Sequence, residues 1–440
     1  MEVQAPEDMA CSVSPTLPAG TCSAGACEIR NAPSANWRWR PGRHHWKLAG
    51  LAPGQGLLLA ESSSPDDPDF EGPYSVCRLT RFDPSQPDHE SVLHEGEGPC
   101  SPWVLHRRHA LGTRWSPEAG RQVWTLLSLD GSTPARDFDL TSLLNARLAA
   151  EGVTASTEKP LWVQGAPGQL LLVWPLQGGK VWIASLTLPG LEFAWTRQVA
   201  GTLEGPPIAD ELGRLYFSVD PAGVVSLSPE GVVRWTLNGA GQPVAVFRDT
   251  LFLDDGTVRS TADGGIRYSW PVAQASVFLS ESHAAVIAPC STNACTRVTL
   301  LRRGSGEVLA DVPVPDASPE YRGTNTSALL TADGAVLVLQ RVQYPDLMYS
   351  PFYPFQGVRR FLVREEQPLQ SLGELLVPTG EHVELNLLSD GQWVAVERDS
   401  FHNDADPGAD LIGVSTPELR APEHGWLTPR GNSAGGSAPE

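Results

Sequence analysis

Three carboxylates near the C-terminus have the residue type and spacing of a calcium site. Asp404, Asp406 and Asp410 lie in the segment DADPGAD, which leads directly into an apolar run. Carboxylates at alternate positions of a loop are how hard oxygen ligands are delivered to Ca²⁺. Because Gly408 offers no side-chain ligand and the spacing to Asp410 is short, the segment also fits a solvated hairpin tip. We therefore expect no cofactor, with calcium as the only exception.

A second segment is suited to binding rather than to catalysis. It reads QYPDLMYSPFYPFQG and carries six large side chains among prolines: Tyr344, Met348, Tyr349, Phe352, Tyr353 and Phe355. Aromatic side chains on a stiff loop lose little entropy on binding, and Tyr offers both an apolar face and a hydroxyl. Such a segment fits a protein, peptide or glycan partner. The alternative is that the rings fold back and are buried within the molecule.

Seven cysteines include two pairs with the same spacing. The candidate disulfides are Cys22 with Cys27, Cys290 with Cys295, and Cys77 with Cys100, which leaves Cys11 unmatched. Disulfides persist in oxidising compartments. The cysteines thus favour an extracytoplasmic protein of the periplasm, cell envelope or secreted class, although no signal peptide is visible in this chain. Seven unrelated thiols in a cytosolic protein remain the alternative.

The composition excludes several classes of function. The formal net charge is −19 at pH 7, so binding to nucleic-acid phosphates or to anionic lipid is not expected. No run reaches the roughly 18 apolar residues of a membrane span, so membrane insertion is not expected either. Gly and Pro supply 42 and 39 of the 440 residues, which favours many tight turns over long helices.

Residues 206–235 contain the clearest repeat, PPIADELGRLYFSVDPAGVVSLSPEGVVRW. Three short apolar runs are separated by turn residues, which predicts an antiparallel sheet that cannot bury both faces alone. Similar hairpins recur at residues 169–183 and 249–260. A tryptophan closes three successive units at intervals of 40 and 35 residues, the length of four strands with their turns: Trp195, Trp235 and Trp270.

This unit resembles the repeat of quinoprotein-like (PQQ-type) β-propellers. The resemblance is carried by the Pro-x-apolar start, by an acidic residue and Gly before Leu-Tyr, and by the final Gly-x-apolar-x-Trp; residues 206–235 match well and their neighbours in part. The family includes pyrroloquinoline-quinone alcohol dehydrogenases and a non-enzymatic branch with the scaffold lipoprotein of bacterial outer-membrane assembly. The resemblance implies an all-β fold, a single propeller of four-stranded blades like that of WD40-type proteins.

The length sets the number of blades. We expect residues 1–35 to be an irregular Cys-, Pro- and Ser-rich leader, residues 36–430 to form the propeller and residues 431–440 to be a flexible tail. At about 40 to 50 residues per blade the propeller has eight blades, with seven as the alternative. Residues 426–432, WLTPRGN, are similar to a segment that opens such propellers, so we expect the C-terminal side to help close the ring.

Four of the predicted hairpins carry an insertion at the same place, between their second and third strands. These insertions are SSSPDDPDFEGP, the segment from Cys290 to Cys295, QYPDLMYSPFYPFQG and DSFHNDADPGAD. In an up-and-down blade this connection always leaves on the same face, and loops on a rigid scaffold are where binding residues concentrate. The four insertions are therefore expected to crowd one rim.

These features predict a non-catalytic binding or scaffold protein that contacts its partner through one loop-rich face. The alternative is a quinone-dependent or other redox enzyme with a funnel-shaped site on the propeller axis, because the fold would suit it. The alcohol dehydrogenases of the family have adjacent cysteines, which this sequence lacks, and no catalytic residue can be assigned. Catalysis is the less favoured hypothesis.

Overall fold

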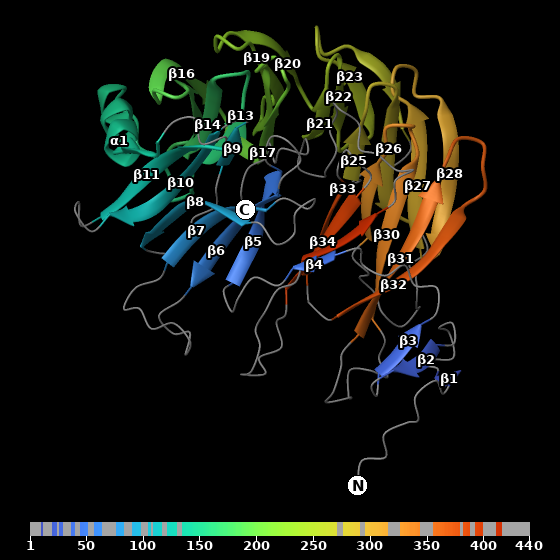
Figure 1. The fold of residues 1–440 in the computed structure, drawn as a ribbon. Helices are drawn as coiled ribbons and strands as arrows, with labels where there is room; N and C mark the ends of the chain where they lie inside the picture. Colours follow the sequence, from blue (N-terminus) through green and yellow to red (C-terminus); the bar gives the residue numbers. More distant parts are fainter. Residues whose placement is uncertain are drawn as a thin grey trace.

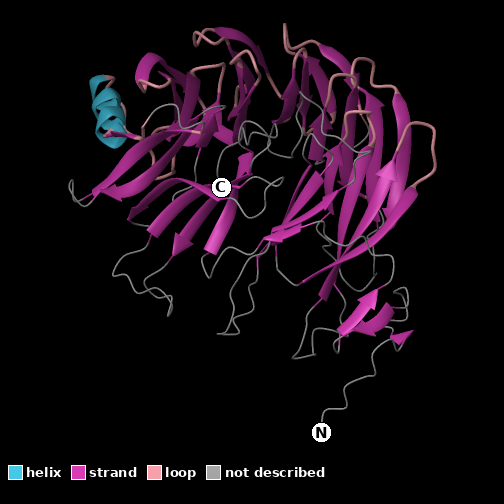
Figure 2. Cartoon of the chain, in the orientation of Figure 1, coloured by secondary structure: helices cyan, strands magenta, loops and turns pink. Residues whose placement is uncertain are grey.

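The computed structural model describes the middle of the chain almost continuously and the rest as separate strands. The described residues are 10–11, 20–23, 26–29, 37–39, 45–51, 57–63, 76–82, 90–97, 104–106, 109–116, 121–129, 134–270, 276–290, 295–315, 326–343, 355–378, 382–387, 392–398 and 411–415. Strands dominate them, as Figure 2 shows.

The strands form eight antiparallel sheets of four strands each, which we number as blades 1 to 8. Blades 1 and 2 consist of β5 (His45–Leu51), β6 (Leu57–Ser63), β7 (Val76–Phe82) and β8 (Glu90–Glu97), then β9 (Val104–His106), β10 (His109–Ser116), β11 (Arg121–Ser128) and β12 (Arg136–Phe138). Blades 3 and 4 consist of β13 (Leu161–Gln164), β14 (Gln169–Leu176), β15 (Lys180–Thr187) and β16 (Glu192–Ala200), then β17 (Thr202–Ala209), β18 (Leu215–Asp220), β19 (Gly223–Leu227) and β20 (Val233–Leu237).

The remaining blades repeat the same order. Blades 5 and 6 consist of β21 (Pro243–Phe247), β22 (Thr250–Leu253), β23 (Thr257–Ser260) and β24 (Ile266–Ser269), then β25 (Ser276–Leu279), β26 (His283–Pro289), β27 (Cys295–Arg302) and β28 (Val308–Pro315). Blades 7 and 8 consist of β29 (Thr326–Leu330), β30 (Val336–Gln343), β31 (Phe355–Val363) and β32 (Gln370–Pro378), then β33 (His382–Leu387), β34 (Gln392–Arg398), β35 (Leu411–Ser415) and β4 (Trp37–Trp39). The predicted propeller and its favoured count of eight blades are confirmed.

The first strand of each blade is the innermost. β9 lies beside β13, and the same holds for β13 with β17, β17 with β21, β21 with β25, β25 with β29 and β29 with β33. Figure 1 shows the blades following one another round a common centre, from blue through green and yellow to red. Radial repetition of this kind leaves only short sheet edges.

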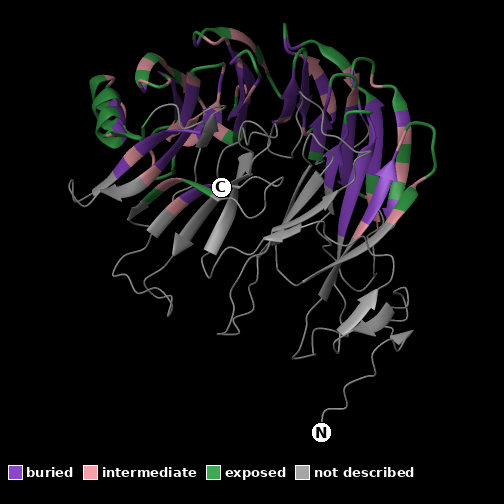
Figure 3. Ribbon diagram, viewed as in Figure 1, coloured by how far each residue is buried: buried purple, intermediate pink, exposed green. Residues whose placement is uncertain are grey.

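Buried residues are concentrated on the strands of the blades, as Figure 3 shows, and apolar side chains of neighbouring blades form common clusters. One cluster spans blades 4, 5 and 6 and includes Tyr216, Phe252 and Leu301. Other clusters join blade 2 to blade 3, blade 3 to blade 4 and blade 6 to blade 7. Because both faces of a blade are covered, a strand such as β15 is a nearly continuous apolar run, buried at six consecutive residues from Val181 to Leu186.

Residues 206–235 form a sheet as the sequence predicts. Within β18, Leu215, Phe217 and Val219 pack toward blade 3, while Tyr216 packs toward blade 5. The turn into β19 has Gly223 with a φ of 76°, and a Cβ there would lie 2.1 Å from the Leu237 carbonyl oxygen. The tight turn therefore depends on glycine.

Strands from the two ends of the chain build blade 8. β4 pairs antiparallel with β35, and Trp39 lies opposite Leu411. The outermost strand of the last blade thus comes from the N-terminal side, whereas the three inner strands come from the C-terminal side. Residues 426–432, expected to help close the ring, lie outside the described residues.

The helix α1 (Leu140–Ala150) is an addition that the repeat does not predict. It follows blade 2 and begins after Asp139, whose carboxylate accepts a hydrogen bond from the Ser142 backbone N–H. Its leucines at positions 140, 144 and 148 are buried in the cluster between blades 2 and 3. Within the described stretches no helix has the length and hydropathy to cross a membrane.

The segment expected to be an irregular leader contains three short strands. β1 (Ala10–Cys11), β2 (Gly20–Ser23) and β3 (Ala26–Ile29) form a small antiparallel sheet of their own. The expected tail, residues 431–440, lies outside the described residues.

Candidate interaction face

The four connections that the sequence predicts to carry insertions, which we call the long connections, join the second and third strands of a blade and have 12, 5, 11 and 12 residues in the order of their blades 1, 6, 7 and 8. They lie between β6 and β7, β26 and β27, β30 and β31, and β34 and β35, at the shared position that the sequence predicts. Consecutive antiparallel strands run in opposite directions, so the second-to-third connections of all blades leave from one face of the ring. We call this the long-connection face.

The long connections belong to one sector of the ring. They occur in blades 6, 7, 8 and 1, and the chain passes from β4 in blade 8 to β5 in blade 1 within residues 40–44. In blades 2 to 5 the same connection is short: four residues after Ser116, three after Leu176, two after Asp220 and three after Leu253. The ring thus has a plain sector and an elaborated sector.

Most residues predicted to bind or to hold calcium lie outside the described residues: Tyr344, Met348, Tyr349, Phe352 and Tyr353, and Asp404, Asp406 and Asp410. Phe355 begins β31 and lies opposite Pro378 in β32. Leu411, which directly follows Asp410, begins β35. Among the described residues no group of three His, Cys, Asp or Glu could hold a metal ion.

One predicted disulfide is present. Cys290 and Cys295 are bonded across the end of the β26–β27 hairpin, with 5.4 Å between their Cα atoms, and the Cys290 N–H donates to the Cys295 carbonyl over 2.9 Å. Cys22 and Cys27 are register partners in the antiparallel pairing of β2 with β3. Cys77 lies in β7, and Cys100 lies outside the described residues.

Aromatic side chains link the blades of the plain sector. Trp195 Nε1 donates to the Pro229 carbonyl over 2.7 Å, and Trp235 Nε1 donates to the Thr261 carbonyl over 3.2 Å. The Tyr268 hydroxyl donates to the Arg303 carbonyl over 2.7 Å. Each donor lies on the outermost strand of one blade, and each acceptor lies in the turn between the third and fourth strands of the next.

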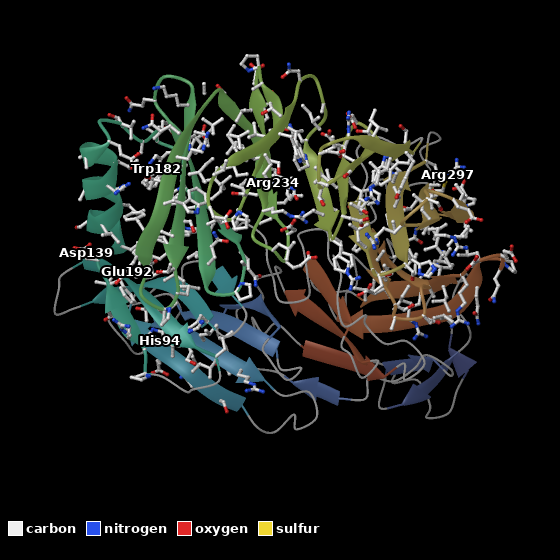
Figure 4. The ribbon with its side chains drawn as sticks, turned by 90° about the horizontal axis from the view of Figure 1, so that it is seen from above. His94, Asp139, Trp182, Glu192, Arg234 and Arg297 are labelled. Carbon is white, nitrogen blue, oxygen red and sulfur yellow. A yellow bond between two sulfur atoms is a disulfide. The ribbon has the colours of Figure 1, made fainter. Side chains whose placement is uncertain are left out.

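Glycines in the same turns allow the rings to approach. A Cβ on Gly231 would lie 2.6 Å from the Trp195 ring, and one on Gly306 would lie 2.4 Å from the Tyr268 ring. Arg234, labelled in Figure 4, reinforces the contact between blades 4 and 5 by donating to the Thr261 and Ala262 carbonyls. Sequence analysis identified the Trp spacing but not this role, for which the signal is the glycine four residues before Trp235 and before Tyr268.

A charged cluster joins blades 5 and 6. Arg303 is buried and donates to the Asp249 carboxylate over 2.8 Å, to the Thr250 hydroxyl over 2.9 Å and to the Glu281 carbonyl. Arg267 lies 2.7 Å from the other oxygen of Asp249. Burial would raise the pKa of Asp249, but hydrogen bonds from Arg303, Thr250 and Arg267 outweigh it and hold the pKa at about 2. The cluster is structural, since every member is satisfied within it.

A buried carboxylate stabilises the turn between β17 and β18. Asp210 accepts hydrogen bonds from the backbone N–H groups of Leu212 and Arg214 and from the Tyr216 hydroxyl, and it pairs with the Arg214 guanidinium. Burial raises the pKa of Asp210, against the opposing charge of Arg214. Asp210 lies three residues before Gly213 of the repeat, so its role is to hold that turn in shape.

Comparison with known proteins gives likeness of fold alone. No family model matches this chain, and no curated protein matches it. Solved structures that it resembles include the WD40 domain of coronin from Toxoplasma gondii, at 9% identity and a TM-score of 0.37 over 89% of this chain and 91% of that chain. The structure of U3-55K is matched at 12% identity and a TM-score of 0.42, over 87% of this chain and 100% of that chain. The WD40 propeller domain of Doa1 is matched at 10% identity and a TM-score of 0.38, over 86% of this chain and 96% of that chain.

At such identities and scores the likeness carries no argument about function. The fold is established by the sheet order, the side-by-side inner strands and the pairing of β35 with β4. The chain is a β-propeller of eight four-stranded blades.

Proposed function

We propose that this protein is a non-catalytic binding scaffold that contacts a protein, peptide or glycan through the long-connection face. The observation that carries the proposal is the placement of three connections of eleven or twelve residues at one strand position in blades 7, 8 and 1, with the disulfide-closed connection of blade 6 at the same position. Loops gathered on one face of a rigid ring are typical of binding surfaces.

The strands beneath the long connections form a firm base. In blade 7 the β30–β31 hairpin is paired up to Gln343 and Gln356, at the ends of the connection, and in blade 6 the Cys290–Cys295 disulfide closes the hairpin. A binding segment held at both ends loses less entropy when it binds.

The composition of the long connections favours a positively charged partner. Residues 64–75, 290–294, 344–354 and 399–410 carry nine carboxylates, with four in the first, one in the third and four in the last, and they carry no Lys or Arg. Acidic side chains accelerate association with a basic surface, and aromatic side chains supply the contact area. Tyr344, Met348, Tyr349, Phe352, Tyr353 and Phe355 remain the proposed contact residues.

The compartment and the family are part of the same proposal. An extracytoplasmic location is supported by the Cys290–Cys295 disulfide, and a place in the non-enzymatic branch of quinoprotein-like propellers is supported by the repeat, whose Gly231 and Trp235 make contacts between blades. A calcium ion at Asp404, Asp406 and Asp410 would stiffen one connection. The quinone-dependent enzyme stays an untested alternative.

The test is to shorten the connection of blade 7, residues 344–354, and to measure binding and folding separately. Residues 344–354 are replaced by a four-residue Asp-Pro-Ala-Gly turn, the sequence of residues 220–223, and partners are captured by proximity labelling in the native host. We expect loss of the labelled partners and an unchanged melting temperature. If the shortened variant and the unmodified protein are both folded and label the same partners, the proposal is contradicted.

A further inference from the structure

Exposed apolar side chains recur at one position on the outermost strands of the blades. Seven large apolar side chains are exposed among the described residues, and four of them lie opposite the residue that follows the β-bulge of the third strand: Val92, Val233, Ile266 and Val308. Val233, Ile266 and Val308 begin the outermost strands of three consecutive blades and are 37%, 62% and 55% exposed. We call these three residues the outer apolar row. Single exposed apolar residues are normal, whereas a repeated set on adjoining elements indicates a contact surface.

In blade 3 the same position is covered by a helix of this chain. The residue there is Phe193, which lies opposite Leu186 and packs edge-on against Trp182. The guanidinium of Arg147, from α1, lies 5.6 Å from the centre of the Phe193 ring, and Arg147 Nη2 donates to the Thr196 hydroxyl over 2.8 Å. An outermost strand of this ring therefore accepts a helix through an apolar residue at this position and a cation beside it.

The outer apolar row and Phe193 point to the same side of their blades. Register partners in an antiparallel pair lie on one face of the sheet. Leu186, the partner of Phe193, belongs to the cluster between blades 2 and 3 that contains the leucines of α1. The partners of the row residues in blades 4 and 6 are Leu227 and Leu301, which pack toward blades 3 and 5. The row thus borders the seams, the contacts between neighbouring blades, as Phe193 does.

The connections that enter blades 4, 5 and 6 are too short to supply a covering helix. α1 has 11 residues and lies in the connection from blade 2 to blade 3, residues 139–160. The chain enters blade 4 through Gly201 alone, blade 5 through residues 238–242 and blade 6 through residues 270–275. A helix that covers the row therefore does not come from the connections between these blades.

The free charges beside the row are negative. Its neighbouring arginines are held by carbonyls and carboxylates of the ring itself: Arg234, Arg267 and Arg302. Glu230 and Asp263, three residues before Val233 and Ile266, are exposed and form no ion pair within the described part of the chain. An apolar surface with free carboxylates is complementary to an apolar and basic partner. A second copy of this chain, with a formal net charge of −19, lacks that complementarity.

We propose that the outer apolar row docks an amphipathic helix of a partner protein, with the apolar side of the helix on the row and its basic side chains beside Glu230 and Asp263. The contact repeats between two molecules what α1 makes within this one. This surface is separate from the one proposed above. The outermost strands begin after the third-to-fourth turns, which leave the ring on the face opposite the long connections.

A synthetic helix tests the proposal on the full chain. The probe has leucines at the spacing of positions 140, 144 and 148 and lysines on both flanks, and a matched peptide has glutamates in place of the lysines. Changing Val233, Ile266 and Val308 together to Thr keeps side chains that suit a strand but makes them polar. We expect the affinity for the Leu-Lys peptide, measured by calorimetry, to fall about ten-fold or more. The control changes two exposed leucines outside the row, Leu143→Gln with Leu212→Gln, and should bind as the unmodified protein does.

Failure of the Leu-Lys peptide to bind the unmodified protein, or equal affinity for the triple variant, overturns the proposal. Equal binding of the Leu-Glu peptide would mean that charge does not select the partner, and would also overturn it.

The triple variant distinguishes two other occupants of the row. A dimer in sedimentation velocity that becomes a monomer in the triple variant would mean that a second copy covers the row. A fall of several degrees in the melting temperature would mean that a segment of this chain covers it. Either result contradicts the proposal, which expects a monomer and a melting temperature within about 1 °C of the unmodified protein.

Discussion

Blades 3 to 5 and blades 6 to 8 use the same four-stranded unit in different ways. In the first set the second-to-third connections have two or three residues, and the seams are closed by Trp195, Trp235 and Tyr268. In the second set the connections are long, and Ala310 and Gly373 occupy the positions of those aromatics. The plain sector supplies stability to the ring, and the elaborated sector carries the long connections available for recognition.

The largest expected effect is on the plain sector. Trp235→Ala removes a ring that packs on Tyr216 and donates to the Thr261 carbonyl, so we expect a loss of about 3 kcal/mol in the free energy of unfolding. Denaturant unfolding measures it. Val232→Ala, at a neighbouring residue that is 59% exposed, is the control and should change little. Equal effects would mean that the Trp235 link does not stabilise the contact between blades 4 and 5.

Sequence reasoning succeeded where the repeat is regular. Alternation of apolar runs and turns predicted β18, β19 and β20. Burial on both faces leaves a continuous apolar signal in β18 and β19, whereas the outer strand β20 is only partly buried and was located by Gly231 and Trp235. It missed α1, although leucines 140, 144 and 148 have helical spacing, because the segment interrupts the repeat between blades 2 and 3.

The seams were beyond sequence reasoning for a different reason. Trp195 and Gly231 lie in different blades, and only the ring geometry brings them together. Arg360, which is 6% exposed in β31, could not be singled out because most arginines of folded proteins are exposed, whereas its burial depends on the blades that enclose its strand. The long connections were found from the spacing of their flanking strands, while their contact residues stay a prediction.

The next largest expected effect on stability is in the elaborated sector, at the disulfide of blade 6. Replacing Cys290 and Cys295 together with Ser opens a loop of six residues, and we expect a loss of about 2 kcal/mol from the freed unfolded chain. Thermal unfolding with and without reductant measures it. A double variant as stable as the oxidised parent would show that the hairpin of blade 6 needs no covalent support.

A smaller effect should appear with pH at the junction of the sectors. Because the pKa of Asp249 is held at about 2, below its usual 3.8, its ionised form stabilises the fold above pH 3.8 and this contribution fades as the pH falls toward 2. Asp249→Asn should therefore flatten the decline in unfolding free energy between pH 4 and pH 2. An unchanged decline in the variant would mean that other carboxylates account for it.

The smallest expected change in stability is at the proposed contact residues. Changing Tyr349, Phe352 and Tyr353 together to Ser should leave the melting temperature within about 1 °C while reducing partner capture. A clear fall in the melting temperature would favour the alternative in which these rings are buried within the molecule.

Photo-crosslinking compares the two sectors most directly. A photoreactive phenylalanine analogue is introduced at Tyr349 in one protein and at Gln177, an exposed residue in the short second-to-third connection of blade 3, in another. Crosslinked partners are then recovered from the native host. We predict a discrete partner from Tyr349 and none from Gln177. A partner recovered from Gln177 alone would contradict the assignment of recognition to the long connections.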